Sequence, residues 1–236
     1  MFIDRFFFKN FEENKIPLLN GDDGEVLSVN SDEEDKYDTT IDEPKLKDFI
    51  LIKLLYKGGF GKVYLAKNTL DGEYYTMKRI RKDRLIEKRQ IENTLNEKNI
   101  MMSNDNPFLL NMHYCYQSDY RLYFVMDFVP GGDLYHHLFK TKGFKEEQVK
   151  FYAAQLIIAF ATLHNHKIIH RDLKPENVLL KEDGYIVLAD FGLAKILQNS
   201  DDITTTQCGT RLYLAPEVEK GEAQSFTVDW WTLGIL

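Results

Sequence analysis

The sequence has few cysteines and no long hydrophobic run. Cys115 and Cys208 are the only two cysteines among 236 residues, and their separation matches no metal-ligand spacing. This usage excludes a disulfide-rich secreted scaffold and favours a reducing environment, so we expect a cytoplasmic location, with the nucleus left open. No apolar run approaches the roughly 20 residues that a membrane-spanning helix needs, so we expect no transmembrane segment.

A strong excess of positive charge is also absent, since the formal net charge is −7 at pH 7. The acidity is uneven: residues 1–44 hold 13 acidic and 4 basic side chains, which leaves residues 45–236 with a net charge of +2. A nucleic-acid-binding surface needs clustered basic residues that displace counterions from phosphates. The charge distribution therefore predicts no nucleic-acid partner.

Residues 1–44 are expected to be an acidic, disordered leader, because dense like charge without apolar periodicity cannot form a core. Charged residues interrupt the apolar start, and no small-residue cleavage site follows, so it is not read as a signal peptide. Two interpretations stay open for this leader. It is a solvating tail, or it has an autoinhibitory or docking role carried by Phe2, Phe6, Phe7, Phe8 and Phe11.

The rest of the chain changes from strand-like to helical patterns at the break Pro130-Gly131-Gly132. Before the break, short β-type runs surround one charged helical stretch, residues 83–103. The expected strands are residues 49–56, 63–68, 74–80, 110–117 and 122–128. We therefore predict a mainly β lobe that precedes a mainly α lobe, with a cleft between them.

After the break, residues 145–166 carry apolar side chains at helical spacing and predict a long amphipathic helix. The apolar positions are Val149, Tyr152, Ala153, Leu156, Phe160 and Leu163. Residues 177–180 and 185–188 flank an Asp-Gly pair and predict a β-hairpin.

A glycine-rich segment, residues 55–63, joins two of the predicted strands and reads Leu-Tyr-Lys-Gly-Gly-Phe-Gly-Lys-Val. Glycines allow backbone amides to approach a phosphate chain that side chains would block. A tight hairpin without a ligand explains the same glycines. Lys78 ends the next strand, where a lone lysine is usually solvated, but the helix bearing Glu97 lies opposite and could orient its ammonium group towards phosphates.

The decisive segment is His170-Arg171-Asp172-Leu173-Lys174-Pro175-Glu176-Asn177, followed by Asp190-Phe191-Gly192. Phosphoryl transfer requires a carboxylate to accept the proton of the attacking hydroxyl, oxygen ligands for Mg²⁺, and cations beside the phosphates. These residue types are supplied by Asp172, Asn177, Asp190 and Lys174. Chance does not explain two such matches at this offset.

These segments resemble the catalytic-loop and magnesium-loop signatures of eukaryotic protein kinases. Residues 206–210 (Thr-Gln-Cys-Gly-Thr), 213–217 (Tyr-Leu-Ala-Pro-Glu) and 229–231 (Asp-Trp-Trp) resemble the AGC group of serine/threonine kinases, and the resemblance covers residues 49–236. It implies an α+β, protein-kinase-like bilobal fold. The mainly β N-lobe is expected over residues 45–130 and a mainly α, incomplete C-lobe over residues 131–236.

The resemblance implies a role for each matching residue. Asp172 is expected to be the catalytic base, Lys174 to steady the transferred phosphate, and Lys78 to grip the α- and β-phosphates once paired with Glu97. ATP and Mg²⁺ are the implied cofactors, with Asn177 and Asp190 as metal ligands. The implied nucleotide-binding residues are Leu55, Gly58, Gly59, Phe60, Gly61, Val63, Lys78, Met126, Asp127 and Val129.

Regulation and substrate choice are implied in the same way. Thr206 matches the activation-loop site that an upstream kinase phosphorylates, with Thr204 and Thr205 as neighbouring competitors, and Arg171 and Lys195 are the natural cations for that phosphate. Thr210 is expected to bond Asp172 and to favour Ser or Thr acceptors. Asp133 and Glu176 are expected to contact the substrate by holding basic residues upstream of the acceptor.

Several positions depart from the kinase pattern. Tyr56 stands at the first glycine position of the phosphate loop, Thr76 replaces a small alanine, and Asn93 lies where close relatives often place a histidine. Arg211-Leu212 replaces the usual proline or acidic pair. The sequence ends at Leu236 inside the expected central helix of the C-lobe, so we interpret the chain as C-terminally incomplete.

The sequence therefore predicts an ATP-dependent serine/threonine protein kinase that acts as a monomer on protein substrates near basic residues. A non-catalytic kinase fragment that binds nucleotide or a partner stays open as the alternative. A small-molecule kinase is disfavoured by Thr210 and by Ala215-Pro216-Glu217, which shape a peptide groove.

Overall fold

The computed structural model describes residues 43–199 and 202–236. Nearly all of the predicted acidic leader lies outside these residues, so both interpretations of it stay predictions. The described residues form two compact units. The first comprises residues 43–83 with Cys115–Phe124, and the second comprises Arg84–Tyr114 with Val125–Leu236. The predicted lobe boundaries stay a prediction.

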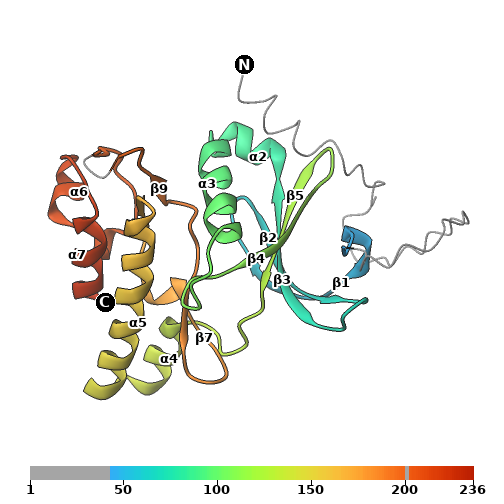
Figure 1. Ribbon diagram of the computed structural model, residues 1–236, viewed down its shortest axis with the longest axis horizontal. Helices are drawn as coiled ribbons and strands as arrows, with labels where there is room; N and C mark the ends of the chain where they lie inside the picture. The colour runs from blue at the N-terminus through green and yellow to red at the C-terminus, as the bar shows by residue number, and fades with distance from the viewer. Residues whose placement is uncertain (1–42, 200–201) are drawn as a thin grey trace, which may run out of the picture. The chain divides into compact units, whose positions relative to one another are not determined.

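The main sheet has five strands in the order β1-β2-β3-β5-β4 (Figure 1). Their bounds are β1 (Phe49–Lys57), β2 (Gly61–Asn68), β3 (Tyr74–Arg81), β4 (Met112–Gln117) and β5 (Arg121–Asp127). Strand β2 pairs antiparallel with both β1 and β3. All five strands occur where the sequence predicts them, with ends shifted by two residues or fewer because strand ends are set by pairing partners rather than by local pattern.

An aromatic cluster closes one face of this sheet in the first unit. The ring of Phe49 lies 5.7 Å from that of Tyr75 and 6.0 Å from that of Tyr116. The Tyr116 hydroxyl donates a hydrogen bond to the Pro44 carbonyl. The 3₁₀ turn η1 (Leu46–Asp48) connects Pro44 to β1, so the cluster fixes where the described chain enters the sheet.

The predicted single helix over residues 83–103 is wrong in one respect, because two helices form. They are α2 (Lys82–Glu87) and α3 (Ile91–Met102). Between them Arg89 adopts a φ of +53°, and the Gln90 N–H bonds the Leu85 carbonyl at 2.9 Å. This hydrogen bond, with Arg89 in the left-handed conformation, forms a helix C-terminal cap. Glycine usually occupies this position, so an arginine here gives no sign in the sequence that the helix ends.

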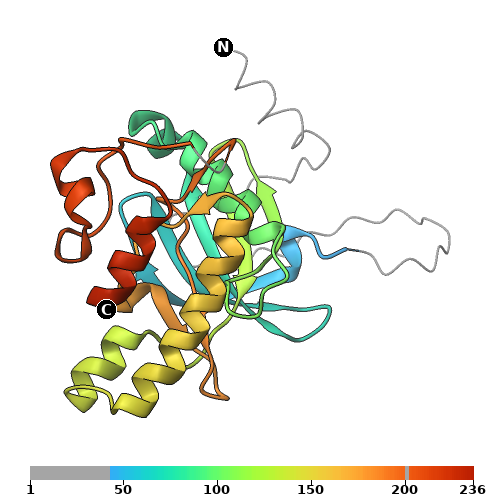
Figure 2. The ribbon, with the colours of Figure 1, turned by 60° about the vertical axis from the view of Figure 1, so that its left-hand side comes forward.

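The second unit is built mainly from helices (Figure 2). They are α3, α4 (Leu134–Thr141), α5 (Glu146–Asn165), α6 (Pro216–Lys220) and α7 (Thr227–Ile235). The structure adds α4, which the sequence analysis does not predict. The Asp133 carboxylate starts this helix by accepting a hydrogen bond from the His136 N–H at 2.7 Å, an N-cap that replaces one missing backbone partner.

Four short strands connect these helices. They are β6 (Ile168–Ile169), β7 (Val178–Leu180), β8 (Ile186–Leu188) and β9 (Lys195–Ile196). Strands β7 and β8 form the predicted hairpin, and β6 pairs with β9.

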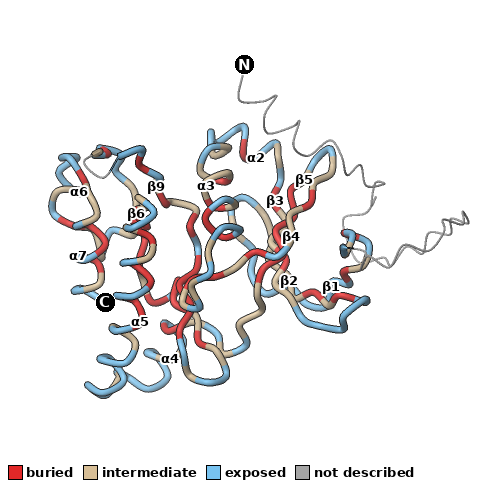
Figure 3. The backbone as a smooth tube through the Cα atoms, in the orientation of Figure 1, coloured by how far each residue is buried: buried red, intermediate tan, exposed pale blue. Residues whose placement is uncertain are grey.

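Helix α5 confirms the predicted long helix, and its C-terminal half lies in the core of the second unit beside α7 (Figures 2 and 3). Leu156, Phe160 and Leu163 are each 2% exposed or less, as the helical spacing predicts. Val149 was placed on the same buried face, but it is 50% exposed. The buried stretch of α5 begins at Gln155, whose side chain accepts a hydrogen bond from the Ile186 N–H of β8. Among the described residues, no helix combines the length and apolar character needed to cross a membrane.

Candidate active site

The catalytic-loop motif forms the connection from β6 to β7 in the second unit. Pro175 begins the 3₁₀ turn η2 (Pro175–Asn177), a position where its fixed φ is favourable and its missing N–H is no loss. The Asn177 carbonyl then accepts the Ala189 N–H at 2.8 Å. Because Ala189 precedes Asp190, this bond ties the two sequence motifs together.

Asp172 is the centre of a compact polar cluster. The Lys174 ammonium group donates to Asp172 Oδ2 at 2.7 Å, and the Thr210 hydroxyl donates to Asp172 Oδ1 at 2.7 Å. Lys174 Nζ also lies 3.2 Å from Thr210 Oγ1. The Asp172 side chain is only 7% exposed, so each contact acts with little competition from water. Three residues predicted to share a site are therefore brought together.

The charge state of Lys174 follows from this cluster. Burial alone would lower the pKa of Lys174, but the hydrogen bond and charge of Asp172, with the charges of Asp190 and Glu176, raise it above the usual lysine value. The ammonium form is therefore favoured by its surroundings. A cation therefore lies beside the predicted base, Asp172.

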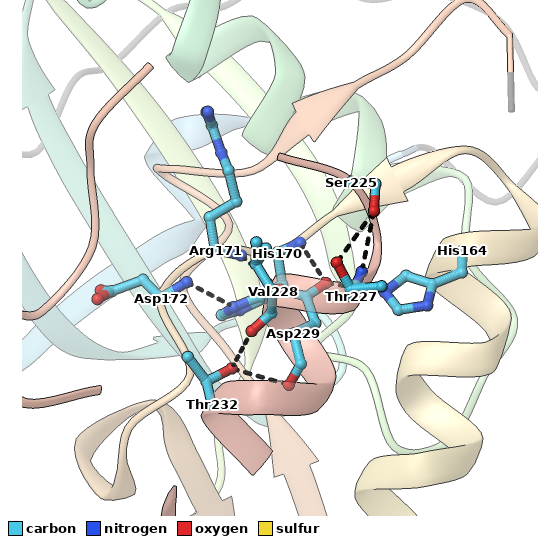
Figure 4. Close-up of polar contacts among 9 residues, drawn as sticks. All are labelled: His164, His170, Arg171, Asp172, Ser225, Thr227, Val228, Asp229 and Thr232. Atoms are coloured by element: carbon cyan, nitrogen blue, oxygen red, sulfur yellow. Dashed lines mark hydrogen bonds and ion pairs between the residues drawn. The ribbon is translucent and has the colours of Figure 1, made fainter. Parts of the chain in front are cut away.

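The loop conformation around Asp172 depends on the buried carboxylate of Asp229 at the start of α7 (Figure 4). Its Oδ1 accepts the Arg171 N–H at 2.9 Å, and its Oδ2 accepts the His170 N–H at 2.9 Å. His164 Nε2 of α5 lies 2.8 Å from the same Oδ2. Asp229 is fully buried, and Arg171 has a φ of +69°. Two backbone hydrogen bonds to a charged acceptor hold this costly conformation.

His170 supports the same loop from within the core. Its Nδ1 accepts the Asp172 N–H at 3.3 Å, which assigns the proton to Nε2, and Nε2 faces the Ala189 carbonyl at 3.3 Å. The ring stands edge-on to Phe191 at 5.5 Å between centroids. His170 is therefore a structural link between the loop of Asp172 and the segment of Asp190.

Asn177 and Asp190 offer the oxygen atoms that a Mg²⁺ ion requires. Asn177 Nδ2 donates to the Asp172 carbonyl at 2.8 Å, so the amide oxygen is directed elsewhere. Asp190 has a φ of +62°, and a Cβ at position 192 would lie 3.1 Å from its Oδ1, so Gly192 leaves the carboxylate room. No cluster of three or more His, Cys, Asp or Glu side chains suited to a metal occurs within residues 43–199 and 202–236. Two protein oxygens fit Mg²⁺, which usually takes its remaining ligands from phosphates and water.

The three threonines of the activation loop differ in accessibility. Thr204 is buried and pairs with Gln224 through two backbone hydrogen bonds of 3.1 and 2.8 Å, whereas Thr205 and Thr206 are exposed. Gln224 Nε2 also donates to the Thr206 carbonyl at 3.2 Å. Lys195 of β9 forms an ion pair with Glu92 of α3 at 3.3 Å.

Behind the activation loop lies a small cavity lined by Arg171, Cys208 and Gln224 together with apolar side chains. Arg171 Nε donates to the Leu193 carbonyl at 2.8 Å. Arg171 Nη1 and Gln224 Oε1 are both buried and have no hydrogen-bond partner in the described part of the chain. Burial raises the pKa of the Cys208 thiol, which Arg171 lowers and Asp172 raises.

The predicted substrate-contacting acids differ in availability. Asp133 Oδ1 is engaged by the N–H of His136 at the start of α4, so Oδ2 is the atom left for a ligand. Glu176 is exposed, and its side chain forms no hydrogen bond or ion pair with other described residues.

The predicted phosphate-binding loop lies between β1 and β2 in the first unit. The Gly58 N–H bonds the Gly61 carbonyl at 2.9 Å, which closes the turn. A Cβ on Gly61 would lie 1.9 Å from the Arg79 carbonyl oxygen, so no other residue fits. A Cβ on Gly58 would lie 3.0 Å from Tyr56 Cε1, so the glycine leaves room for the tyrosine ring beside the turn. Val63 stands opposite Lys78 in the β2–β3 register.

The predicted adenine-contacting residues of the second unit are the last two residues of β5, Met126 and Asp127, with Val129 just after the strand. Met126 is 5% exposed. The Asp127 N–H is used internally, because it donates to the Asn111 carbonyl at 3.1 Å. The Asp127 side chain lies 2.6 Å from His113 Nε2.

Comparison with known proteins assigns the chain to a family. The family model described as "protein kinase domain" matches residues 49–236. The chain belongs to the protein kinase family. It is 46% identical over 191 residues to serine/threonine-protein kinase Sgk3 of Rattus norvegicus, which covers 80% of this chain and 38% of that protein.

Two further relatives of this kinase have similar sequence identity to it. A RAC family serine/threonine-protein kinase homolog of Dictyostelium discoideum is 45% identical over 190 residues, covering 80% of this chain and 43% of the relative. Serine/threonine protein kinase ypkA of Aspergillus fumigatus is 45% identical over 192 residues, covering 81% and 30%. The motifs and these relatives agree with the AGC group. The chain spans less than half the length of each of these three relatives.

Two predicted site residues of this kinase lie in different units. Lys78 belongs to β3 of the first unit, and Glu97 belongs to α3 of the second and is 4% exposed. Their pairing stays a prediction. Within the second unit, Glu97 Oε2 lies 4.0 Å from the position that a Cβ on Gly192 would take, so α3 presents this carboxylate near the segment of Asp190.

The sequence motifs assign no function to Asp229, His164 or Gln224. Asp229 was noted only as part of an Asp-Trp-Trp motif. The available signal was an acidic residue in an otherwise apolar helix, since charged side chains are almost never fully buried unless paired. Gln224 carries no comparable signal, because its role depends on contacts with residues far away in sequence.

Proposed function

We propose that this kinase domain transfers the γ-phosphate of ATP to Ser or Thr hydroxyls of protein substrates, with Mg²⁺. One observation carries the proposal: the buried Asp172 carboxylate is held between Lys174 and Thr210 at 2.7 Å each. Proton transfer from the acceptor hydroxyl needs a carboxylate, and the transferred phosphate needs a nearby cation, so this arrangement supports the proposal.

Asp172 acts as the base in this proposal. Each carboxylate oxygen has two acceptor positions, so Oδ1 can accept the substrate hydroxyl beside the bond from Thr210. The acceptor oxygen forms a bond to the γ-phosphorus while the bond from that phosphorus to the β–γ bridging oxygen breaks. The hydroxyl proton passes to Asp172, and ADP leaves with the bridging oxygen. Lys174 offsets the negative charge on the transferred group.

Asn177 and Asp190 would hold the metal through the amide oxygen and the carboxylate. When bound, Mg²⁺ would neutralise the negative charge of the phosphates. The hydrogen bond from Asn177 Nδ2 to the Asp172 carbonyl fixes the amide so that its oxygen is the ligand. Gly192 keeps the space beside the Asp190 carboxylate open.

Nucleotide binding is assigned to the glycine-rich loop, Lys78 and the end of β5 with the residues directly after it. Leu55, Val63 and Met126 are assigned apolar contacts with adenine. Because the Asp127 N–H already bonds Asn111, the Asp127 carbonyl is the group assigned to the adenine amine, and the Val129 backbone is assigned a second hydrogen bond to adenine.

Thr210 favours Ser and Thr acceptors, because its bond to Asp172 places a small side chain where the acceptor hydroxyl arrives. Glu176, exposed and unpaired among the described residues, is assigned to a basic residue upstream of the acceptor. Asp133 contributes only Oδ2, since Oδ1 caps α4. We therefore assign a basophilic protein substrate.

Thr206 is assigned as the site at which an upstream kinase phosphorylates the activation loop. Thr204 is buried and bonded to Gln224, which argues against it, whereas Thr206 is exposed. A phosphate there adds up to two negative charges. Arg171, with its buried unpaired Nη1, and Lys195 are its assigned partners.

The test is phosphate transfer from radiolabelled ATP to a basic peptide by the full-length protein, with Mg²⁺. Asp172→Ala is expected to abolish transfer, while thermal stabilisation by Mg-ATP persists. Equal rates for the variant and the parent would overturn the catalytic assignment. Stabilisation by Mg-ATP without transfer to any peptide by the parent would favour a nucleotide-binding module instead.

A further inference from the structure

Gln224 is a buried glutamine in the connection between α6 and α7, and only 1% of it is exposed. Its backbone N–H donates to the Thr204 carbonyl at 2.8 Å, and its carbonyl accepts the Thr204 N–H at 3.1 Å. Its side-chain Nε2 donates to the Thr206 carbonyl at 3.2 Å. Three hydrogen bonds therefore join this one residue to two positions of the activation loop.

The stretch of chain that carries Gln224 is itself fixed in place. Helix α7 begins three residues after Gln224, and its Asp229 accepts the Arg171 N–H of the catalytic loop (Figure 4). Val228 of the same helix packs in a buried cluster with Ile169 of β6. One short stretch of chain therefore contacts the activation loop through Gln224 and the catalytic loop through Asp229.

The activation loop contacts the catalytic loop again at Thr210, whose hydroxyl donates to Asp172 Oδ1 at 2.7 Å. Only residues 207–209 separate Thr210 from the Thr206 carbonyl that Gln224 holds. We therefore expect a displacement of Thr206 to disturb the residue that bonds the proposed base.

None of the bonds made by Gln224 requires a phosphate on Thr206, because they use backbone groups and a neutral amide. In the proposed function, a phosphate would hold the same loop through a different atom, the side-chain oxygen of Thr206, by binding Arg171 and Lys195. Arg171 Nη1 is buried without a hydrogen-bond partner in the described part of the chain, and Arg171 lines the same cavity as Gln224. The amide and the phosphate are therefore two separate ways to hold Thr206.

We propose that Gln224 is a positioning residue that holds the activation loop in its transfer-competent arrangement before Thr206 is phosphorylated. This rests on the proposed function, in which Thr206 is the phosphorylation site. A hydrogen bond between neutral groups contributes less than one to a charged group, so the phosphate gives the stronger hold. The unphosphorylated protein is expected to keep about a tenth of the kcat/KM of the phosphorylated protein, and this basal activity depends on Gln224.

The experiment compares two forms of the full-length protein. One form is treated with a phosphatase, and the other carries phosphothreonine inserted at position 206 during translation. Intact-mass measurement before and after each assay confirms the state of Thr206. The values of kcat and KM are determined for a basic peptide with Mg-ATP.

Gln224→Met removes the amide while changing the side-chain volume little. In the unphosphorylated form, its kcat/KM is expected to fall about tenfold below that of the unphosphorylated parent, because the Thr206 carbonyl loses its donor. In the phosphorylated form the fall is expected to be about twofold or less, since the phosphate still holds the loop and interactions that share a residue are not additive. A residue that only stabilises the fold would lower kcat/KM equally in both forms.

Gln198→Met is the matched control. It makes the same change at an exposed glutamine that precedes the activation-loop threonines, and the Gln198 side chain forms no hydrogen bond within residues 43–199 and 202–236. Both forms of this control should match the parent. Gln224→Asn is the second variant: it keeps the buried position polar, but its side chain is one methylene too short to reach the Thr206 carbonyl. It should show the same selective loss, and its result decides if Gln224→Met does not fold.

Each outcome supports or overturns the proposal. If both forms of Gln224→Met keep the parent's rates, or if both lose activity equally, the positioning role is wrong and the kinase function stands. The same conclusion follows if the phosphorylated parent transfers phosphate and the unphosphorylated parent does not. If neither form of the parent transfers phosphate to the peptide, the proposed function fails, and the role of Gln224 fails with it.

Discussion

The carboxylate of Asp229 accepts the backbone N–H of Arg171 at 2.9 Å and thereby fixes the residue that immediately precedes the proposed base. Arg171 has a φ of +69°, a conformation that costs a non-glycine residue about 1–3 kcal/mol. The hydrogen bond to the fully buried Asp229 carboxylate of α7 offsets this conformational cost. The placement of Asp172 therefore depends on a helix more than 50 residues further along the chain.

Replacing Asp229 is expected to unfold or strongly weaken the second unit. Asp229→Ala leaves two backbone N–H groups and His164 without their buried acceptor, and breaking such a buried charged network costs about 3–5 kcal/mol. Urea denaturation of the full-length protein measures the loss. Asp105→Ala, at an exposed aspartate, is the control and should shift the midpoint little. A midpoint for Asp229→Ala equal to the control's would contradict the anchor role.

Gly209 is expected to tolerate no side chain. Its φ is +111°, and a Cβ would lie 2.6 Å from the Arg171 carbonyl oxygen and 2.9 Å from Leu214 Cδ2. Gly209→Ala should therefore lower both thermal stability and kinase activity. Gly184→Ala is the matched control, because Gly184 also has a positive φ but no atom within 4 Å of the added carbon. Equal melting temperatures for the two variants would refute the steric argument.

The Thr210 hydroxyl is expected to matter for turnover rather than for folding. Thr210→Val keeps the shape but removes the bond to Asp172; a hydrogen bond to a charged group contributes about 1.5–3 kcal/mol, so kcat should fall by about 10- to 100-fold. Thr210→Ser retains the hydroxyl and should retain most of the activity. Steady-state kinetics on a basic peptide separate the two, and similar kcat values for both variants would exclude the hydroxyl's role.

Cys208 is expected to react slowly with alkylating reagents in the folded protein. Burial raises the pKa of its thiol, with Arg171 opposing and Asp172 adding to the shift, so less thiolate is present at pH 8 than at an exposed cysteine. The raised pKa means that the fold favours the protonated thiol. Its contribution to stability is complete below the ordinary thiol pKa and is lost as the pH rises through the raised value.

Iodoacetamide kinetics on a Cys115→Ser protein report on Cys208 alone. The rate should be below that of the same protein unfolded in urea and should rise across alkaline pH. A folded rate at pH 8 that matches the unfolded rate would show that the thiol is neither buried nor shifted.

Local sequence patterns predicted the elements whose signals are local. Alternating strands and the helical spacing of Leu156, Phe160 and Leu163 depend on neighbours within a few residues, so these predictions were confirmed. The break at Arg89 was missed because a left-handed residue is normally read from glycine. The insertion of β5 between β3 and β4 is a long-range pairing that no local pattern specifies.

The sequence motifs predicted the residues of the candidate site. They did not predict the residues that hold the site in place. Asp172, Lys174 and Thr210 were expected to act together because the kinase signatures name them. The burial of Thr204 and the anchoring by Asp229 depend on which distant segments meet. The hydrogen bond by which Asp133 Oδ1 caps α4 was not predicted either, because α4 itself was not predicted.

The ion pair between Lys195 and Glu92 would give the proposed phosphorylation of Thr206 a second consequence. If a phosphate on Thr206 recruits the Lys195 ammonium group, it must compete with a carboxylate on the first turn of α3. Phosphorylation then acts as an exchange of partners: the loop gains a tether as the start of α3 is released. Since Glu97 lies near the middle of that same helix, release of Glu92 would also loosen the segment that carries Glu97.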